Sequence, residues 1–395
     1  MKTKSAYIGL CYICFLIGGL GITMVGALLP DIMAEYRLDY KTAGTILSLQ
    51  SLGIMLAAFF SGAFADRLGK KTTLALGVCL FGAGLSSFIF ASHTLGLQIC
   101  CAVAGIGYGM INNMGNSLVN DISEGNNIAI NLLHVSYAVG CFLVPLLVQF
   151  SIMLNSTWRF PVKVSAILAG FIFLAIVISP LHNMNEDKKA ASRSSYGFLK
   201  DVHYYVLLLA LLLCTGFHNG IIGWLVTYLI DSGIIDAIGA QRLFSFMLLS
   251  MIIGRLMISV LCKYIKPDTL LLLCCTIPVL VLSCMAITGN QNYVVALLIL
   301  CGISYAGQYP LIVSNAKKIL LNNANASGLL FALSGLGGTL TTYLCGYSAE
   351  RFGARAILFT IILVGILLWG TSLLNRRMMR RKCIIRFEKC ESICH

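Results

Sequence analysis

Uncharged polar side chains interrupt four long apolar stretches of the sequence at helical spacing. In chain order the four sets are Asn112, Asn113 and Asn116, then His134 and Tyr137, then His218, Asn219 and Trp224, and last Tyr305 and Gln308. Side-chain amides donate and accept hydrogen bonds without carrying a charge, and aromatic rings cover the apolar faces of a ligand. This inventory predicts contacts with a neutral, hydroxyl-rich solute such as a sugar.

Two interpretations of these polar side chains are open. Polar groups inside a membrane usually face the protein interior or a water-filled cavity, but they also join helices to one another by hydrogen bonds. Their presence in four stretches favours a shared cavity. His134 and His218 are the embedded groups that titrate near neutral pH. Either could couple solute movement to protons, or each could be a neutral, hydrogen-bonded histidine.

Charged side chains are nearly absent from the apolar stretches. Every Asp and Glu lies at the end of a stretch, in a loop or in the tail, and Asp31 comes nearest to an embedded position. The pattern therefore argues against carboxylate-based proton symport and leaves facilitated diffusion, exchange or histidine-linked coupling open.

Arg255 is the embedded cation. It could bind an anionic solute, or extend its charge to the inner membrane boundary, and its place after Gly254 in the inner half favours the second interpretation.

The stretches that position these side chains are long enough to cross a bilayer. Of the 395 residues, 58% are hydrophobic and 11% are charged, whereas soluble domains carry about 25% charged residues. A helix needs about 20 apolar residues to cross the hydrocarbon core. We therefore predict an all-α polytopic membrane protein with twelve transmembrane helices, near residues 6–29, 43–65, 72–92, 95–119, 128–150, 160–180, 203–230, 240–262, 268–288, 292–315, 326–348 and 354–374.

The distribution of charge predicts how these helices are oriented. The net charge is +13, and most Lys and Arg residues fall at the helix ends that share one side with both termini, which the positive-inside rule makes cytoplasmic. The charge therefore reflects topology, and no nucleic-acid partner is expected. Compact loops favour a bacterial inner membrane. The basic tail could rest on anionic lipid, and we expect a monomer.

The chain divides into two similar halves. A polar segment at 181–200 separates six predicted helices in residues 1–180 from six in residues 201–375, and a basic cytoplasmic tail follows at 376–395. Two six-helix halves with a site between them are typical of transporters built from parallel repeats. Most of the 16 Cys residues lie inside apolar stretches, where cysteine behaves as a small buried hydrophobe. No metal site and no cofactor are predicted.

The loop between the second and third predicted helices carries a motif. It reads Gly62-x-x-x-Asp66-Arg67-x-Gly69-Lys70-Lys71, and in position, sign and spacing it resembles the signature loop of the major facilitator superfamily. Trp158-Arg159 and the segment 346–353 are also similar to that superfamily. The amide-bearing fourth helix, the Asn131-x-x-His134 pattern in the fifth and Tyr309-Pro310 in the tenth resemble its fucose–proton-symporter-like branch.

The resemblance implies two six-helix bundles around a central cavity, with the motif acting as a gate. Asp66 would face the positive N-terminus of the eleventh helix near Ala326, and Arg67 would reach Asp121 at the end of the fourth. Gly69 and Lys70 belong to the same gate. Such contacts would hold the cytoplasmic side closed in one state and break in the other. The alternative is a tight positive turn that only enforces topology.

The combined interpretation is a secondary transporter that moves a small polar solute, first of all a neutral sugar, by alternating access. Efflux of a drug or metabolite by the same superfamily is the alternative, although the lack of embedded carboxylates counts against cationic drugs. A receptor or scaffold that transports nothing is a third possibility, and the intact motif argues against it. The sequence contains no H-E-x-x-H motif and no acid pair in the apolar stretches, so no enzymatic activity and no catalytic residue are predicted.

Overall fold

The chain is helical throughout the part that the structure describes. A computed structural model describes residues 2–124, 126–179, 197–288, 291–320 and 324–394. The helices are α1 (Lys2–Tyr36), α2 (Tyr40–Leu68), α3 (Lys70–Phe90), α4 (Thr94–Ile122), α5 (Asn127–Met153), α6 (Arg159–Ile178), a short 3₁₀ helix η1 (Gly197–Lys200), α7 (Val202–Asp231), α8 (Ala237–Leu261), α9 (Pro267–Thr288), α10 (Gln291–Tyr305), α11 (Gln308–Leu320), α12 (Ala324–Phe352) and α13 (Arg355–Cys394).

The predicted transmembrane helices are confirmed. Twelve helical segments among the described residues are long and apolar enough to cross a membrane, and α10 and α11 together make one of them. The helix breaks between Tyr305 and Gln308 because Pro310 has no N–H to donate to the carbonyl of Ala306 and its ring crowds that carbonyl. The backbone ladder resumes where Leu311 donates to Gly307 at 3.0 Å.

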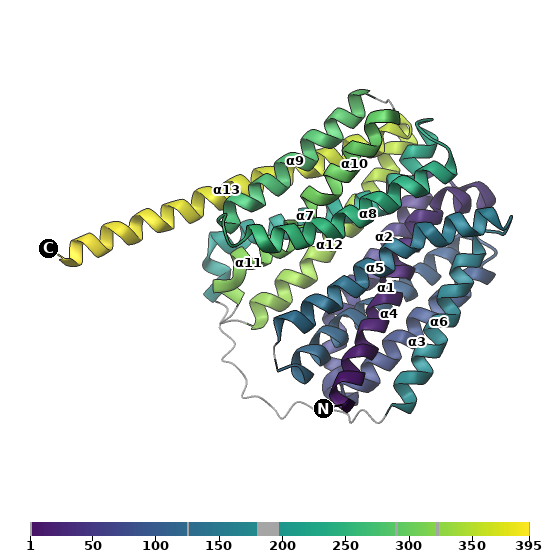
Figure 1. Ribbon diagram of the computed structural model, residues 1–395, viewed down its shortest axis with the longest axis horizontal. Helices are drawn as coiled ribbons and strands as arrows, with labels where there is room; N and C mark the ends of the chain where they lie inside the picture. The colour runs from purple at the N-terminus through teal and green to yellow at the C-terminus, as the bar shows by residue number, and fades with distance from the viewer. Residues whose placement is uncertain (1, 125, 180–196, 289–290, 321–323, 395) are drawn as a thin grey trace.

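The predicted linker and tail are described only in part. Residues 181–196 of the predicted linker lie outside the described residues, and its last four residues, 197–200, form η1. Helix α13 continues from the last membrane segment through the predicted tail to Cys394 and projects away from the other helices (Figure 1). The division of the chain into two domains and a tail stays a prediction.

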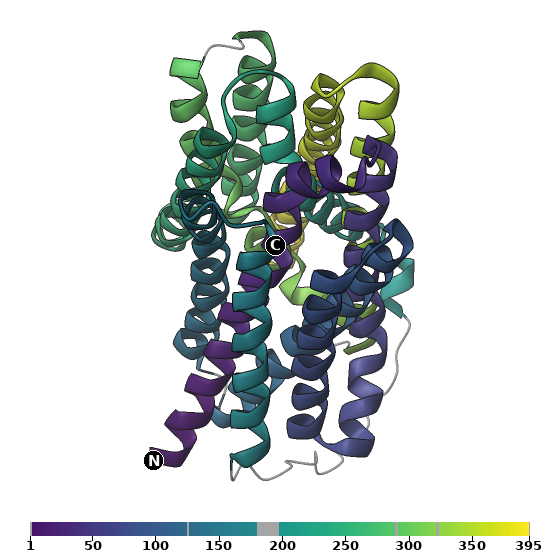
Figure 2. The same ribbon diagram turned by 90° about the vertical axis from the view of Figure 1, so that its right-hand side faces the viewer.

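The helices pack as two groups that meet along three pairs. In the first group α2 and α3 flank α4, α1 lies against α5, and α6 lies against α3. In the second group α12 and α13 lie against α7, and α10 packs between α8 and α9. The groups meet where α2 contacts α12, α1 contacts α7 and α5 contacts α8 (Figures 1 and 2). Each of these pairs joins one half to the other, so a solute site between the halves would be lined by these helices.

The two ends of the helix bundle carry different turns. The motif side holds the N-terminus and the turn between α2 and α3, and the opposite side holds the turn between α1 and α2 (Figure 1). Many large apolar side chains on the outer faces of the helices are exposed, among them Phe59, Phe171, Leu256 and Leu363. Such faces suit lipid, because backbone hydrogen bonds inside the helices leave no polar group unpaired there.

Candidate functional site

Close backbone packing joins the two halves on the opposite side. A methyl group at Gly26 on α1 would overlap the carbonyl oxygen of Ile222 on α7, so glycine is needed for this approach. Nearby, Gln241 on α8 donates from Nε2 to the carbonyl oxygen of Ala27 at 2.6 Å. The opposite side is therefore sealed by contacts between α1 and two helices of the second half.

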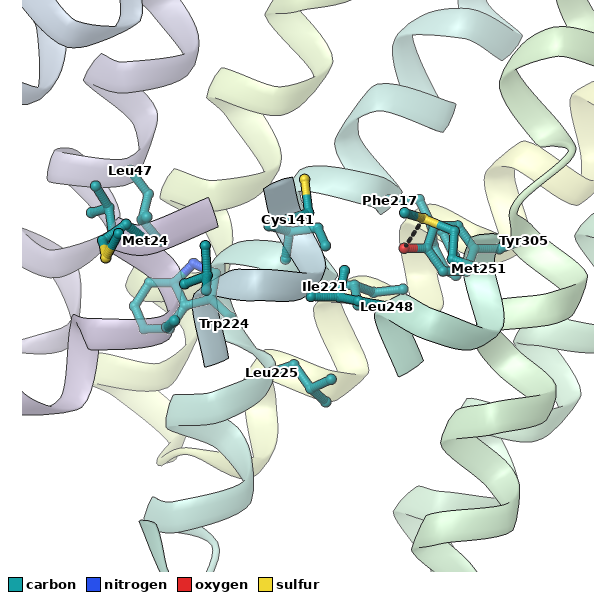
Figure 3. Close-up of a cluster of buried hydrophobic side chains, with 14 of the residues drawn as sticks. Met24, Leu47, Cys141, Phe217, Ile221, Trp224, Leu225, Leu248, Met251 and Tyr305 are labelled. Carbon is teal, nitrogen blue, oxygen red and sulfur yellow. Dashed lines mark hydrogen bonds between the residues drawn. The ribbon is translucent and has the colours of Figure 1, made fainter. Parts of the chain in front are cut away.

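An apolar cluster fills the interface between the halves. Figure 3 shows Met24 of α1 and Leu47 of α2 beside Trp224 of α7, and Leu248 of α8 near Ile221. All of these side chains are buried. The cluster draws on both halves, so it forms only while the halves are closed at this level.

A polar cluster around Tyr40 adds a second set of contacts across the halves. The Tyr40 hydroxyl donates to Asp231 Oδ2 at 2.9 Å, and its backbone N–H donates to Glu350 Oε2 at 3.0 Å. Asp39 caps the same end of α2 by accepting from the backbone N–H of Thr42 at 2.8 Å. Hydrogen bonds from Thr42 hold the pKa of Asp39 below its usual value. We call Tyr40, Asp231 and Glu350 the outer latch.

Glu350 belongs to a segment that matches the signature loop. The loop after α2 reads Asp66-Arg67-x-Gly69, and the turn after α12 reads Glu350-Arg351-x-Gly353. Both glycines have φ of 83°, a left-handed conformation that favours glycine. Because α2 and α12 run antiparallel, the two carboxylates lie at opposite ends of one helix pair. Glu350 meets the N-terminus of α2, and a carboxylate at a helix N-terminus is favourable.

The predicted gate on the motif side is not engaged across the halves. Asp66 and Arg67 are exposed, and in the described part of the chain neither makes a side-chain hydrogen bond or an ion pair. The prediction that Arg67 reaches Asp121 is wrong for this structure, because Lys70 takes that place with Nζ at 2.7 Å from Oδ2. Lys70 begins α3 directly after Gly69, so it points at the end of α4, whereas Arg67 ends α2 facing outward.

The three amides of α4 divide between two faces of the helix. Asn112 and Asn116 are half-buried and joined, because Asn116 Nδ2 donates to the Asn112 side-chain oxygen at 3.2 Å and to its backbone carbonyl at 2.8 Å. Asn113 instead donates to Ser61 Oγ on α2 at 2.8 Å. Asn113 is also half-buried, but this bond lies inside the first half, so in this structure its amide serves a contact between α4 and α2.

The polar residues of α5 keep accessible surface at the level of the α4 amides. His134 is exposed with its ring 5.8 Å from that of Phe15, and Tyr137 is half-buried and stacks on Tyr108 with ring centroids 5.7 Å apart. Both side chains pack against aromatic rings of neighbouring helices of the first half and still have open surface. Side chains that line an internal space have this combination.

The predicted residues of α7 have different surroundings. His218 and Asn219 are half-buried; the His218 ring lies 5.8 Å from that of Tyr305, and Asn219 Nδ2 donates to Ser51 Oγ on α2 at 3.3 Å. Trp224 is fully buried and donates from Nε1 to the carbonyl of Thr342 at 3.0 Å. The predicted substrate contact of Trp224 is therefore not formed, since its polar atom and both ring faces serve packing.

The predicted pair on the broken helix is buried. Tyr305 donates to Met251 Sδ at 3.1 Å (Figure 3). Gln308 is 2% exposed, and its Nε2 donates to the carbonyl of Cys274 on α9 at 3.0 Å. The prediction that Gln308 faces the central space is wrong for this structure. As the first residue of α11, Gln308 satisfies a carbonyl beside the helix break.

Sequence reasoning missed the outer latch. Tyr40, Asp231 and Glu350 sit at helix ends, where charged and aromatic side chains are common on a membrane protein. The signal that could have found them is the repeat of the Asp66-Arg67-x-Gly69 pattern at Glu350. Arg255, which was expected to extend toward the membrane boundary, is half-buried on α8.

Comparison with known proteins agrees with this architecture. The family model described as Major Facilitator Superfamily matches residues 11–320. The glucose/mannose transporter GlcP of Bacillus subtilis is 20% identical over 380 residues, which cover 93% of this chain and 94% of GlcP. The quinolone resistance protein NorA of Staphylococcus aureus is 28% identical over 163 residues, which cover 40% of this chain and 41% of NorA.

Solved structures share the fold. A bacterial homologue of the human lysosomal transporter Spinster, in an inward-facing and occupied conformation, superposes with a TM-score of 0.78 at 12% identity and covers 95% of this chain and 97% of its own. FucP in the outward conformation superposes with a TM-score of 0.65 at 17% identity, covering 94% and 99%. With twelve membrane-spanning helices and a family match over most of its length, this integral membrane protein belongs to the major facilitator superfamily of transporters.

Proposed function

We propose that the chain transports a small polar solute, first of all a sugar, by alternating access. The observation that carries this proposal is an asymmetry between the two ends. The halves are joined by the outer latch and by the α1–α7 approach on the opposite side, while on the motif side Asp66 and Arg67 are exposed and make no side-chain hydrogen bond or ion pair with any described residue of the other half. A solute site open to one side at a time requires such a difference.

The polar side chains between the two ends supply the proposed site. Asn112 and Asn116 of α4, His134 of α5 and His218 of α7 keep accessible surface, and they come from both halves. With both termini in the cytoplasm, as the charge distribution predicts, this structure corresponds to a state open to the cytoplasm. The outer latch would then break, and the Asp66 contact form, in the state open to the outside.

The side-chain chemistry supports a sugar over other solutes. The amides of Asn112 and Asn116 can donate to and accept from hydroxyl groups, and Tyr137 and His218 offer ring faces. The similarity to a glucose/mannose transporter extends over nearly the whole chain. NorA matches less than half of it, so drug efflux is the second candidate.

The test is a binding and exchange experiment on the purified protein. A ligand that binds the folded state raises its melting temperature by mass action. We expect glucose, mannose or a related sugar to stabilise the wild type and to exchange across proteoliposomes. Asn116→Ala should weaken binding about tenfold, the loss expected when about 1.4 kcal/mol of hydrogen bonding disappears.

A matched control comes from the neighbouring residue. Asn113→Ala removes an amide bonded to Ser61 inside the first half, so it should lower the melting temperature without changing sugar affinity. Stabilisation by quinolones and not by any sugar would replace the proposal with drug efflux. Equal losses of affinity in both variants would remove α4 from the binding site.

A further inference from the structure

Arg255 lies on the inward face of α8. Leu248, Met251 and Arg255 follow at three- and four-residue spacing and therefore share one side of the helix. Leu248 and Met251 are buried in the interface cluster, and Met251 accepts from Tyr305 on α10 (Figure 3). The exposed apolar residues of α8, Ile253, Leu256, Met257 and Val260, lie on the other side. The Arg255 side chain thus starts toward the centre of the molecule and away from lipid.

Arg255 lies near groups of both halves. Its guanidinium is within electrostatic range of Tyr108 of α4, His134 of α5 and His218 of α7. Tyr108 and His218 lie near the middle of their helices. A side chain extended toward the membrane boundary would carry its charge away from these groups. The guanidinium is therefore directed inward, contrary to the extension that the sequence favoured.

No protein carboxylate neutralises this cation in the described part of the chain. The ion pairs Lys70–Asp121 and Arg159–Glu35 do not involve Arg255. An unpaired cation at membrane depth is unfavourable, and residues that are embedded and charged usually face a pathway. Asn112 and Asn116 follow Tyr108 at four-residue spacing, so the two amides share a face of α4 with a residue that lies near Arg255.

We propose that Arg255 binds the carboxylate of an acidic sugar, such as a hexuronate, whose hydroxyl groups meet Asn112 and Asn116. A guanidinium forms two parallel hydrogen bonds with a carboxylate, and the added geometric specificity favours the acid over its neutral analogues. The solute then supplies the negative charge that the helices lack. This inference rests on the proposed sugar transport and names the class of sugar.

The test compares D-galacturonate, its methyl ester and D-galactose on the purified full-length protein. The ester keeps the ring and hydroxyl groups and removes only the charge. We expect the wild type to bind galacturonate at least about tenfold more tightly than the ester, as one charge-assisted bond implies. Arg255→Gln should abolish that preference and leave ester binding unchanged. Arg242→Gln, an exposed arginine at the other end of α8, should preserve it.

The outcomes separate this inference from the proposed function. Equal binding of acid and ester by the wild type would overturn the role of Arg255 and leave sugar transport standing, and so would a preference that survives in Arg255→Gln. The failure of all three galacto-configured compounds would overturn the inference about Arg255, and the separate glucose and mannose measurement would then decide the proposed function. If Arg255→Gln does not fold, the wild-type comparison of acid with ester still tests the role of the carboxylate. Arg255→Lys should retain a reduced preference for the acid, because lysine keeps the charge but cannot form the two parallel hydrogen bonds of a guanidinium.

Discussion

At the scale of single residues, burial decides what each charge does. The Lys70 side chain is 7% exposed and its partner Asp121 is 29% exposed, with 2.7 Å between Nζ and Oδ2. Arg67, three residues earlier, is exposed. The pair joins α3 to α4 within the first half, so it stabilises that half whichever side of the transporter is open. The predicted gate would then depend on the exposed Asp66 and Arg67.

Asp121→Asn should therefore destabilise the protein more than Arg67→Ala. Replacing the carboxylate leaves a buried ammonium with a neutral partner, which costs about 1–3 kcal/mol, whereas an exposed side chain without contacts is worth within about 0.5 kcal/mol. Melting temperatures in detergent measure the difference. A larger loss in Arg67→Ala would mean that Arg67, as the sequence suggested, is the true partner of Asp121.

Sequence reasoning proposed which polar residues line a site, but it did not predict the direction of each side chain. Asn112 and Asn113 are adjacent, chemically identical and both half-buried, yet Asn112 accepts from Asn116 on its own helix and Asn113 donates to Ser61 on α2. Gln308 and Trp224 carry the residue types expected at a sugar site, and both satisfy backbone carbonyls. Which partner an amide or indole meets depends on how neighbouring helices are rotated, and a single sequence does not contain that information.

At the scale of elements, the prediction was better, because helices depend on local composition. All twelve membrane segments were found, and the aromatic-proline step at Tyr309-Pro310 marked the helix that breaks into α10 and α11. The contacts between helices were not predicted. They depend on small residues such as Gly26, and the sequence contains 38 glycines with nothing to show which of them faces the other half.

Substituting a glycine should have different effects within a half and between the halves. A methyl group at Gly105 would overlap the Gln50 carbonyl oxygen within the first half, and one at Gly26 would overlap Ile222 across the halves. Gly105→Ala should lower the melting temperature, because crowding a packed core typically costs about 1–3 kcal/mol. Gly26→Ala should leave it nearly unchanged, since the halves can separate, and should slow transport. Equal melting temperatures of the Gly105→Ala and Gly26→Ala variants would argue against two halves that move as rigid units.

At the scale of the whole molecule, the helix pair α2 and α12 carries one carboxylate at each end. Their antiparallel packing places Glu350 against the N-terminus of α2 at 3.0 Å, while Asp66 at the other end is exposed. If the proposed alternating access pivots these two helices against each other, only one end can close at a time. Contacts at the two ends would then compete, and weakening one should favour the other.

Glu350→Ala should shift the equilibrium toward the state that is open on the opposite side. Exposed contacts of this kind are worth up to about 1 kcal/mol, so the open-to-closed ratio should rise up to about fivefold. Trp224 reports the change, because it is fully buried 6.4 Å from Tyr40 between ring centroids. In a Trp158→Phe, Trp369→Phe background, acrylamide should quench its fluorescence more strongly in the Glu350 variant.

The control for that experiment lies on the same turn of α12. Arg351 stacks on Tyr347 of its own helix, with 4.8 Å from Cζ to the ring centroid, so Arg351→Ala should leave the quenching of Trp224 unchanged. Increased quenching in both variants would indicate loosening of α12 itself rather than release of the outer latch.

Asp66→Asn should act in the opposite direction. In the state that closes the motif side, the carboxylate would face the N-terminus of α12, an interaction worth about 0.3–1 kcal/mol, and the amide would lose most of it. Transport should slow while solute affinity stays nearly intact. Trp224 should stay protected from acrylamide, because Asp66 makes no contact that closes the opposite side.

The decisive measurement is the double variant. If the two ends compete, Glu350→Ala added to Asp66→Asn should restore the balance between the states and recover part of the transport rate. If each carboxylate only stabilises its own helix end, the two losses should add.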